Sequence, residues 1–158
     1  MSNTLINKVL DSNTTVSSLV LRVPLGLVLA AHGAQKLFGW FGGYGLEGTG
    51  QWMASIGFEP GYLMALLAGS GEFFGGLALV LGLLTRPAAL VTGFTMLMAL
   101  TFHWPNGLFL SNNGYEYALM LTVASLTLAI QGAGRWSLDH WLLQQLAEKS
   151  AQNKQKTA

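Results

Sequence analysis

Four apolar stretches occupy most of this chain, at residues 17–38, 61–84, 87–104 and 115–131. A bilayer's hydrocarbon core is about 30 Å thick, and roughly 17–25 apolar residues in a helix are enough to cross it. Lipid offers no partner to an unpaired backbone amide, so such stretches can cross only as helices or as closed barrels. The pattern predicts an all-α integral membrane protein built as a bundle of four transmembrane helices.

Composition supports a membrane protein and excludes several kinds of function. Hydrophobic residues make up 51% of the chain and charged residues 9%, whereas a soluble domain has about 25% charged residues. The net charge of +1, without a basic block, argues against nucleic acid as a partner. The absence of cysteine excludes disulfides, iron–sulfur clusters and thiolate zinc sites. Redox chemistry would therefore need a bound cofactor, a metal held by histidine and carboxylate groups, or a partner protein.

We divide the chain into a cytoplasmic amino-terminal segment (1–16), a membrane domain (17–137) and an amphipathic to polar cytoplasmic tail (138–158). The apolar pattern of the first stretch continues beyond Ala34, which favours a retained span over a cleaved secretory signal. The connection 39–60 is rich in glycine, and Trp52, Met53 and Ile56 recur in it at helical spacing. We expect a short amphipathic helix there, lying at the outer membrane interface.

Basic residues near the ends of the spans predict the orientation. Arg22, Arg86 (expected in a turn at residues 85–87) and Arg135 fall on one side if the chain crosses four times. The positive-inside rule then places both termini in the cytoplasm of a bacterial inner membrane. Lys36 lies at the opposite, outer end of the first span, which indicates a functional or ion-pairing role.

The second stretch carries a single charge, Glu72, near its middle. A charged group at the bilayer centre costs about 2.5–3.5 kcal/mol or more, so it normally faces a partner or a polar cavity. Gly71 and Gly75 surround it in a G-x-x-x-G pattern that permits a second helix to approach closely. Glu72 is therefore the first candidate for a functional residue.

Other polar side chains of the spans gather in the outer half of the membrane. The spacing of His32, Gln35 and Lys36 places them on one face of the first helix. His103 is expected at the outer end of the third helix and Glu116 in the first turn of the fourth. Together with Glu72 they predict a polar cavity that opens to the outer side and closes at Glu72.

Each of these residues also has a purely structural interpretation. His103 would be an interfacial residue, Glu116 would favour the amino end of its helix, and Lys36 would extend to the headgroups. Glu72 is too deep to reach the headgroups, so its structural alternative is a buried ion pair that holds the bundle together.

Several motifs together resemble the DoxX family of small bacterial membrane proteins. Their order along residues 18–140 matches the family throughout. The motifs are His32-Gly33-Ala34-Gln35-Lys36-Leu37-Phe38-Gly39, Phe41-Gly42-Gly43, Gly45-Leu46-x-Gly48-Thr49, Gly57-Phe58-x-Pro60, Glu72-Phe73-x-Gly75-Gly76, Gly82-Leu83-Leu84-Thr85-Arg86, Asn113-Gly114-Tyr115-Glu116-Tyr117 and Gly132-x-Gly134-Arg135-x-Ser137-Leu138-Asp139.

The resemblance implies a four-helix inner-membrane protein linked to quinone-dependent sulfur oxidation. Relatives of that family are described as oxidoreductase subunits or as parts of membrane redox and detoxification assemblies. The residues of this chain that match the family pattern are His32, Gln35, Lys36, Glu72, Arg86, Glu116 and Arg135.

Two mechanisms fit these residues. In the first, the cavity binds a quinone or a small oxidisable compound: His32, Gln35, Lys36, Glu72 and Glu116 form the binding site, and Glu72, His32 and Lys36 are catalytic, with Glu72 relaying a proton. In the second, His32, Glu72 and His103 hold a metal ion, with Glu116 as a further ligand.

A third hypothesis is not catalytic. The chain would be a transporter, a lipid-binding module or an anchor for a soluble enzyme, and the tail from Leu138 would be its docking element. The expected partners are the lipid bilayer and a redox protein, and the glycine-lined helix faces are compatible with a homo-oligomer.

Overall fold

The computed structural model describes residues 16–156, and all regular structure in this range is helical. The α-helices are α2 (Val16–Phe38), α3 (Gly45–Ser55), α4 (Gly61–Leu81), α5 (Thr85–His103), α6 (Glu116–Gln131) and α7 (Leu138–Lys156). Short 3₁₀ turns cover Trp40–Gly42, Trp104–Asn106 and Leu110–Asn112. Each predicted apolar stretch forms a helix, and the ends differ by no more than three residues.

Three of these helices are long and apolar enough to cross a membrane. They are α2, α4 and the continuous segment Thr85–Asn106 that contains α5. The fourth apolar helix, α6, has 16 residues and is shorter. The described part of the chain is thus a helical membrane protein, as predicted.

The turn between α4 and α5 lies three residues earlier than predicted. Gly82 and Leu84 both have positive φ angles, of 66° and 46°, and α5 already begins at Thr85. A glycine in the left-handed conformation commonly ends a helix. Pro87 falls in the first turn of α5, where its missing amide hydrogen has no helical partner to lose. The predicted turn at residues 85–87 is therefore helical.

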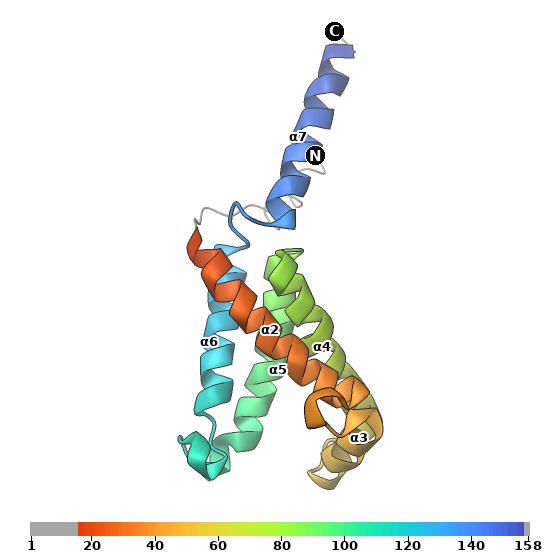
Figure 1. Ribbon diagram of the computed structural model, residues 1–158, viewed down its shortest axis with the longest axis vertical. Helices are drawn as coiled ribbons and strands as arrows, with labels where there is room; N and C mark the ends of the chain where they lie inside the picture. The colour runs from red at the N-terminus through yellow and green to blue at the C-terminus, as the bar shows by residue number, and fades with distance from the viewer. Residues whose placement is uncertain (1–15, 157–158) are drawn as a thin grey trace.

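The helices diverge toward one end of the bundle (Figure 1). α2 crosses the other spans and packs on α4, while α5 and α6 run side by side in opposite directions. α3 lies beside α4 at one end, which we call the α3 end. α7 projects from the opposite end, which we call the α7 end.

Glycines let α2 and α4 pack at very short range. A Cβ atom on Gly33 would lie 2.4 Å from the backbone nitrogen of Phe73, and one on Gly76 would lie 2.5 Å from the nitrogen of Ala30. Small residues at such contacts are typical of helix pairs in membranes. Gly33 of α2 and Gly76 of α4 thus serve the contact between these two helices.

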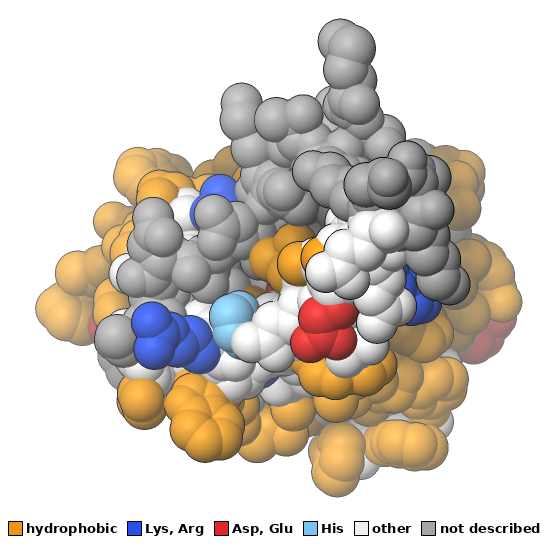
Figure 2. Space-filling view, turned by 90° about the horizontal axis from the view of Figure 1, so that it is seen from above, with side chains coloured by type: hydrophobic (Ala, Val, Ile, Leu, Met, Phe, Trp, Pro, Cys, Tyr) orange, Lys and Arg blue, Asp and Glu red, His pale blue; other side chains and the backbone are white. Residues whose placement is uncertain are grey.

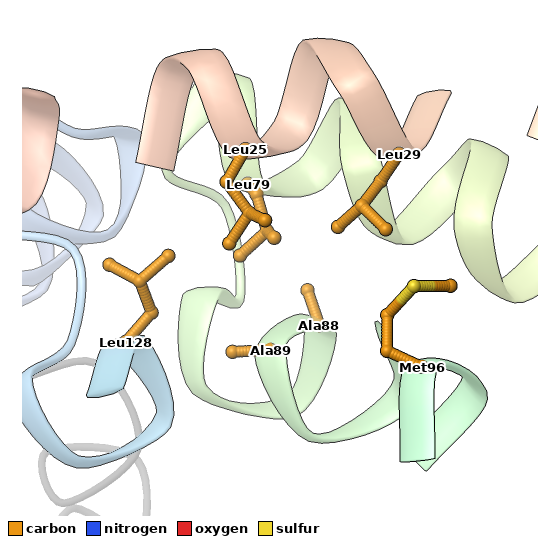
Figure 3. Packing of buried hydrophobic residues seen from close by; sticks show 7 residues of the cluster. All are labelled: Leu25, Leu29, Leu79, Ala88, Ala89, Met96 and Leu128. Atoms are coloured by element: carbon orange, nitrogen blue, oxygen red, sulfur yellow. The ribbon is translucent and has the colours of Figure 1, made fainter. Parts of the chain in front are cut away.

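The apolar core lies where α2, α4, α5 and α6 meet. Leu25 and Leu29 of α2 point toward Leu79 of α4 and toward α5, and Leu128 of α6 completes the cluster (Figure 3). The perimeter is apolar as well, since hydrophobic side chains form most of the rim seen from the α7 end (Figure 2). A bundle that is apolar inside and outside is suited to lipid surroundings.

Arg22 is buried at the α7 end, with 2% of its surface exposed. Its Nη1 donates hydrogen bonds to the carbonyl oxygens of Leu79, at 2.9 Å, and of Val80, and its Nη2 donates to that of Trp136. Ser18 Oγ donates to the carbonyl of Gly132 at 2.9 Å. Arg22 is thus more than the boundary charge that its sequence position indicates, because it ties α2 to α4 and to the chain after α6.

Asp139, at the start of α7, completes the α7 end. Its carboxylate accepts hydrogen bonds from the backbone amides of Leu84, at 2.6 Å, and Thr85, at 2.9 Å. The first amides of a helix lack partners within the helix, and a carboxylate there is favourable. The second residue of the predicted tail is therefore buried and caps α5.

Candidate functional site

A cavity of about 850 Å³ lies at the α3 end, between α2, α4, α5 and α6 and bordered by α3. Its wall is mainly apolar, whereas the sequence indicates a polar cavity. The reason is that α4 and α5 contribute leucine, methionine and phenylalanine side chains around only a few polar ones. The polar lining consists of His32, Lys36, Glu72, Thr95, His103 and Tyr117.

Lys36 and Glu72 form an ion pair in this cavity. The distance between Lys36 Nζ and Glu72 Oε2 is 2.6 Å, and the side chains are 25% and 3% exposed. The structure therefore supplies the partner that a carboxylate at this depth requires. The lysine remains accessible while the carboxylate is enclosed, so a ligand would meet the lysine first.

The backbone of α4 makes room for this pair. Gly69 lies three residues before Glu72, on the same face of the helix. A Cβ atom on Gly69 would lie 2.8 Å from Leu37 Cδ2 and 3.2 Å from Lys36 Cβ. The missing side chain lets the last turn of α2 rest on α4, and this brings the ammonium group to Glu72.

His32 and Tyr117 form a second polar pair beside the first. Tyr117 Oη lies 3.4 Å from His32 Nε2, and the two ring centroids are 5.9 Å apart. His32 is one helical turn before Lys36, and Tyr117 is in the first turn of α6. The cavity thus brings two adjacent hydrogen-bonding pairs together from three helices.

Tyr117 is absent from the candidates named from the sequence. It appears in the sequence analysis only as the last residue of the matched motif Asn113–Tyr117. Its neighbour Tyr115 does lie in the connecting loop, stacked on Trp104 at a centroid distance of 4.6 Å. The position of each tyrosine relative to the start of α6 distinguishes the two, because Tyr115 precedes the helix and Tyr117 is its second residue.

Two predicted binding residues, Gln35 and Glu116, do not line the cavity. Gln35 Nε2 donates to the carbonyl of Phe41 at 3.3 Å, so it faces the 3₁₀ turn after α2. Glu116 Oε1 accepts a hydrogen bond of 2.5 Å from the amide of Leu110. Both side chains support the backbone of neighbouring loops.

His103 lines the cavity at the end of α5, and its Nδ1 lies 2.8 Å from the carbonyl oxygen of Asn113. Within residues 16–156, no three His, Asp or Glu side chains gather so that they could hold a metal ion. The set His32, Glu72 and His103 is therefore without geometric support as a metal site. Glu72 is engaged by Lys36 and His103 by the loop.

Comparison with known proteins supports the membrane assignment. The family model DoxX matches residues 17–104. The chain is 36% identical over 132 residues to the inner membrane protein YqjF of Escherichia coli (strain K12), covering 80% of this chain and 92% of that protein. It is 30% identical over 130 residues to the Bacillus subtilis (strain 168) protein named "Putative oxidoreductase CatD", covering 82% and 90%. No solved structure matches it. The relatives and the apolar helices indicate the bacterial inner membrane as its location, and the chain belongs to the DoxX family.

Proposed function

We propose that this chain is the ligand-binding component of a membrane redox or detoxification system. Its cavity would take a quinone or a small oxidisable ring compound. The observation that carries the proposal is the accessible Lys36 beside the enclosed Glu72, at the inner wall of an apolar cavity. A cavity of about 850 Å³ with few polar groups is of the size and character that small-molecule sites have.

The ion pair is better explained by ligand binding than by support of the bundle. A buried ion pair often adds little net stability, because desolvation offsets much of the attraction. Close packing at Gly26, Gly33 and Gly76 already holds α2 against α4. The pair is therefore available for another task, and its position in the cavity wall favours contact with a ligand.

Each polar side chain would have a distinct task. Lys36 and His32 would hydrogen-bond an oxygen of the ring, and Tyr117 would orient His32. Oxidation of a ring that carries two hydroxyl groups releases two protons and two electrons. Glu72 would accept one proton and His32 the other, since general bases act through such short contacts. The two electrons would pass to a partner redox protein.

We further propose that α2, α4, α5 and α6 all cross the membrane, with both termini in the cytoplasm. α6 packs along α5, and Thr92 Oγ1 lies 3.3 Å from Ser125 Oγ between them. It therefore occupies the same layer as its longer neighbour. With four crossings, Arg22, Arg86 and Arg135 lie on one side, as the positive-inside rule requires of the cytoplasmic face. The α3 end would then face outward.

The first test is to identify what copurifies with the full chain in mild detergent. We expect mass spectrometry of the extract, together with an ultraviolet–visible spectrum, to reveal a quinone or a related phenol near one per chain. A chain that copurifies with no such compound, and that also fails to bind added decylubiquinone, would contradict the proposal.

The second test separates chemistry from support. Glu72→Gln keeps the shape of the side chain and removes its charge, so we expect decylubiquinone binding to weaken at least tenfold while the bundle stays folded. Glu47→Gln is the matched control, because Glu47 is exposed on α3. Its Oε1 accepts a long hydrogen bond, of 3.3 Å, from Gln51 Nε2. Loss of folding in Glu72→Gln, with Glu47→Gln intact, would instead assign the pair to support.

A second candidate function is favoured by α7. This 19-residue helix extends away from the bundle (Figure 1), and the residues from Leu146 to Asn153 are exposed. The chain could then serve as a membrane anchor for a soluble enzyme without binding a small molecule itself. Removal of residues 146–158 would abolish that role and leave ligand binding unchanged.

A further inference from the structure

Some side chains of the cavity wall are also exposed on the outer surface of the bundle. Leu67 of α4 is 58% exposed, and Phe94 and Met98 of α5 are 64% and 38% exposed. Other wall residues are not, since Leu29 is 0% and Met96 is 6% exposed. Leu67, Phe94 and Met98 thus both line the cavity and are exposed, as side chains at an opening between α4 and α5 would be.

This opening has two defined edges. At one edge α4 and α5 touch, because a Cβ atom on Gly71 would lie 3.2 Å from both Val91 Cγ1 and Thr95 Oγ1. At the other edge α3 meets α5, where the rings of Trp52 and Phe102 pack at a centroid distance of 5.2 Å. Thr95 and Phe102 are seven residues apart, or about 10 Å along the helix. We call the opening between these edges the lateral window.

The proposed four crossings would place the lateral window beside the hydrocarbon layer. Phe94 and Met98 lie in the interior of α5, and Leu67 lies in the interior of α4. α4 and the segment that contains α5 are each long and apolar enough to cross a membrane. The divergence of α4 and α5 toward the α3 end is visible in Figure 1. A window flanked by leucine, phenylalanine and methionine offers no hydrogen bond to a molecule that arrives from water.

The cavity is also graded in polarity from the window to its inner wall. The window is apolar, and the Lys36–Glu72 and His32–Tyr117 pairs lie within. A molecule that satisfies both regions has a compact oxygen-bearing head and an apolar tail. Burial of such a tail would contribute about 0.8 kcal/mol for each methylene group removed from water.

We propose that the ligand enters from the bilayer through the lateral window and leaves its apolar tail lying between Leu67, Phe94 and Met98. This inference rests on the proposed function and narrows its ligands to membrane-dissolved ring compounds that carry a tail. It sets aside small water-soluble phenols as the main ligands.

The test uses a benzoquinone with an alkyl tail that carries a diazirine near its end, added to the full chain in phosphatidylcholine vesicles. After illumination, the labelled peptides are sequenced, with and without excess tail-less dimethoxybenzoquinone as competitor. We expect competed labelling on the α4 and α5 peptides that contain Leu67, Phe94 and Met98.

The other outcomes are distinct. Competed labelling on α6, on the α3 segment or on the loop around Leu110 would overturn the lateral window and leave the proposed function in place. Labelling that the competitor does not reduce anywhere would overturn the proposed function, and the window with it.

A variant pair gives a kinetic test of the same window. Met98→Trp narrows the opening, so we expect the tailed quinone to associate at least fivefold more slowly, with no change for the tail-less compound. Val123→Trp is the matched control, because Val123 is 50% exposed on α6 and does not line the cavity. Equal association rates of the tailed quinone with the two variants would overturn entry through the window.

Discussion

The two ends of the bundle use their polar residues in opposite ways. At the α7 end, Arg22 and Asp139 bind the backbone of other elements, and 2% or less of each is exposed. At the α3 end, Lys36 and Glu72 bind each other beside a cavity. Side chains committed to the backbone hold helices in place, whereas a pair made of side chains can exchange partners when a ligand arrives. We therefore expect substitutions at the α7 end to affect stability first, and those at the α3 end to affect binding first.

The largest effect is expected from Arg22→Leu. It removes the donor of three hydrogen bonds to backbone carbonyls of α4 and of the loop before α7. A hydrogen bond to a charged group contributes about 1.5–3 kcal/mol, and three are lost together, so we expect the largest loss of stability in this series. Thermal unfolding in detergent would measure it, with the exposed Arg135→Leu as control. Equal Tm values for the two variants would contradict the supporting role of the α7 end.

Lys36→Met should cost less, and its cost should depend on Glu72. The single variant leaves a 3% exposed carboxylate without its partner, at the lower end of about 3–5 kcal/mol. The double variant Lys36→Met/Glu72→Gln removes both charges, so we expect it to regain at least half of this loss. A double-mutant cycle on the free energy of unfolding measures the coupling. Simple additivity would show that the two side chains do not interact.

Asp139→Ala tests the α7 end through a single cap. It exposes the amides of Leu84 and Thr85, and loss of a helix cap costs about 0.5–2 kcal/mol. We expect a lower Tm with unchanged ligand affinity per folded molecule. Glu148→Ala, on the exposed part of α7, is the control. A change in affinity without a change in Tm would mean that the two ends are not separate in function.

The smallest effect on stability is expected from Tyr117→Phe. The contact with His32 is long, at 3.4 Å, and a neutral hydrogen bond contributes about 0.5–1.5 kcal/mol at most. We expect almost no change in Tm and a threefold to tenfold weaker binding of decylubiquinone. Tyr62→Phe is the control, since Tyr62 is 55% exposed and lies outside the cavity wall. Identical affinities in the two variants would remove Tyr117 from the site.

Hydropathy and depth predict the helices and single out Lys36 and Glu72, but they do not predict which side chains meet or which way a side chain points around its helix. The apolar stretches differ from the observed helices by a few residues, because burial in lipid selects for composition along the whole element. The sequence indicates an ion-pairing role for Lys36 and for Glu72 separately, and the structure shows that each is the partner of the other. Gln35 and Glu116 lie at the expected depth, yet their side chains face loops. Successive side chains of a helix point about 100° apart, so a residue at the depth of the cavity can still point away from it.

The contacts of the α7 end have almost no sequence signal. Arg22 bonds to carbonyls 57, 58 and 114 residues away, and any residue carries a carbonyl. Positive charge near a membrane end also fits the topological rule, which conceals the structural role. Asp139 is similar, because its partners are backbone amides of a turn that the sequence places three residues too late.

The capping of α5 by Asp139 also has a consequence for how the protein is made. A chain is synthesised from its amino end, so the amides of Leu84 and Thr85 are made 55 and 54 residues before the carboxylate that binds them. The α4–α5 hairpin therefore enters the membrane with its turn unfinished, and the last helix completes it. Until Asp139 has been made and has reached the turn, the first amides of α5 lack this cap, so α4 and α5 form before the contact that completes their connection.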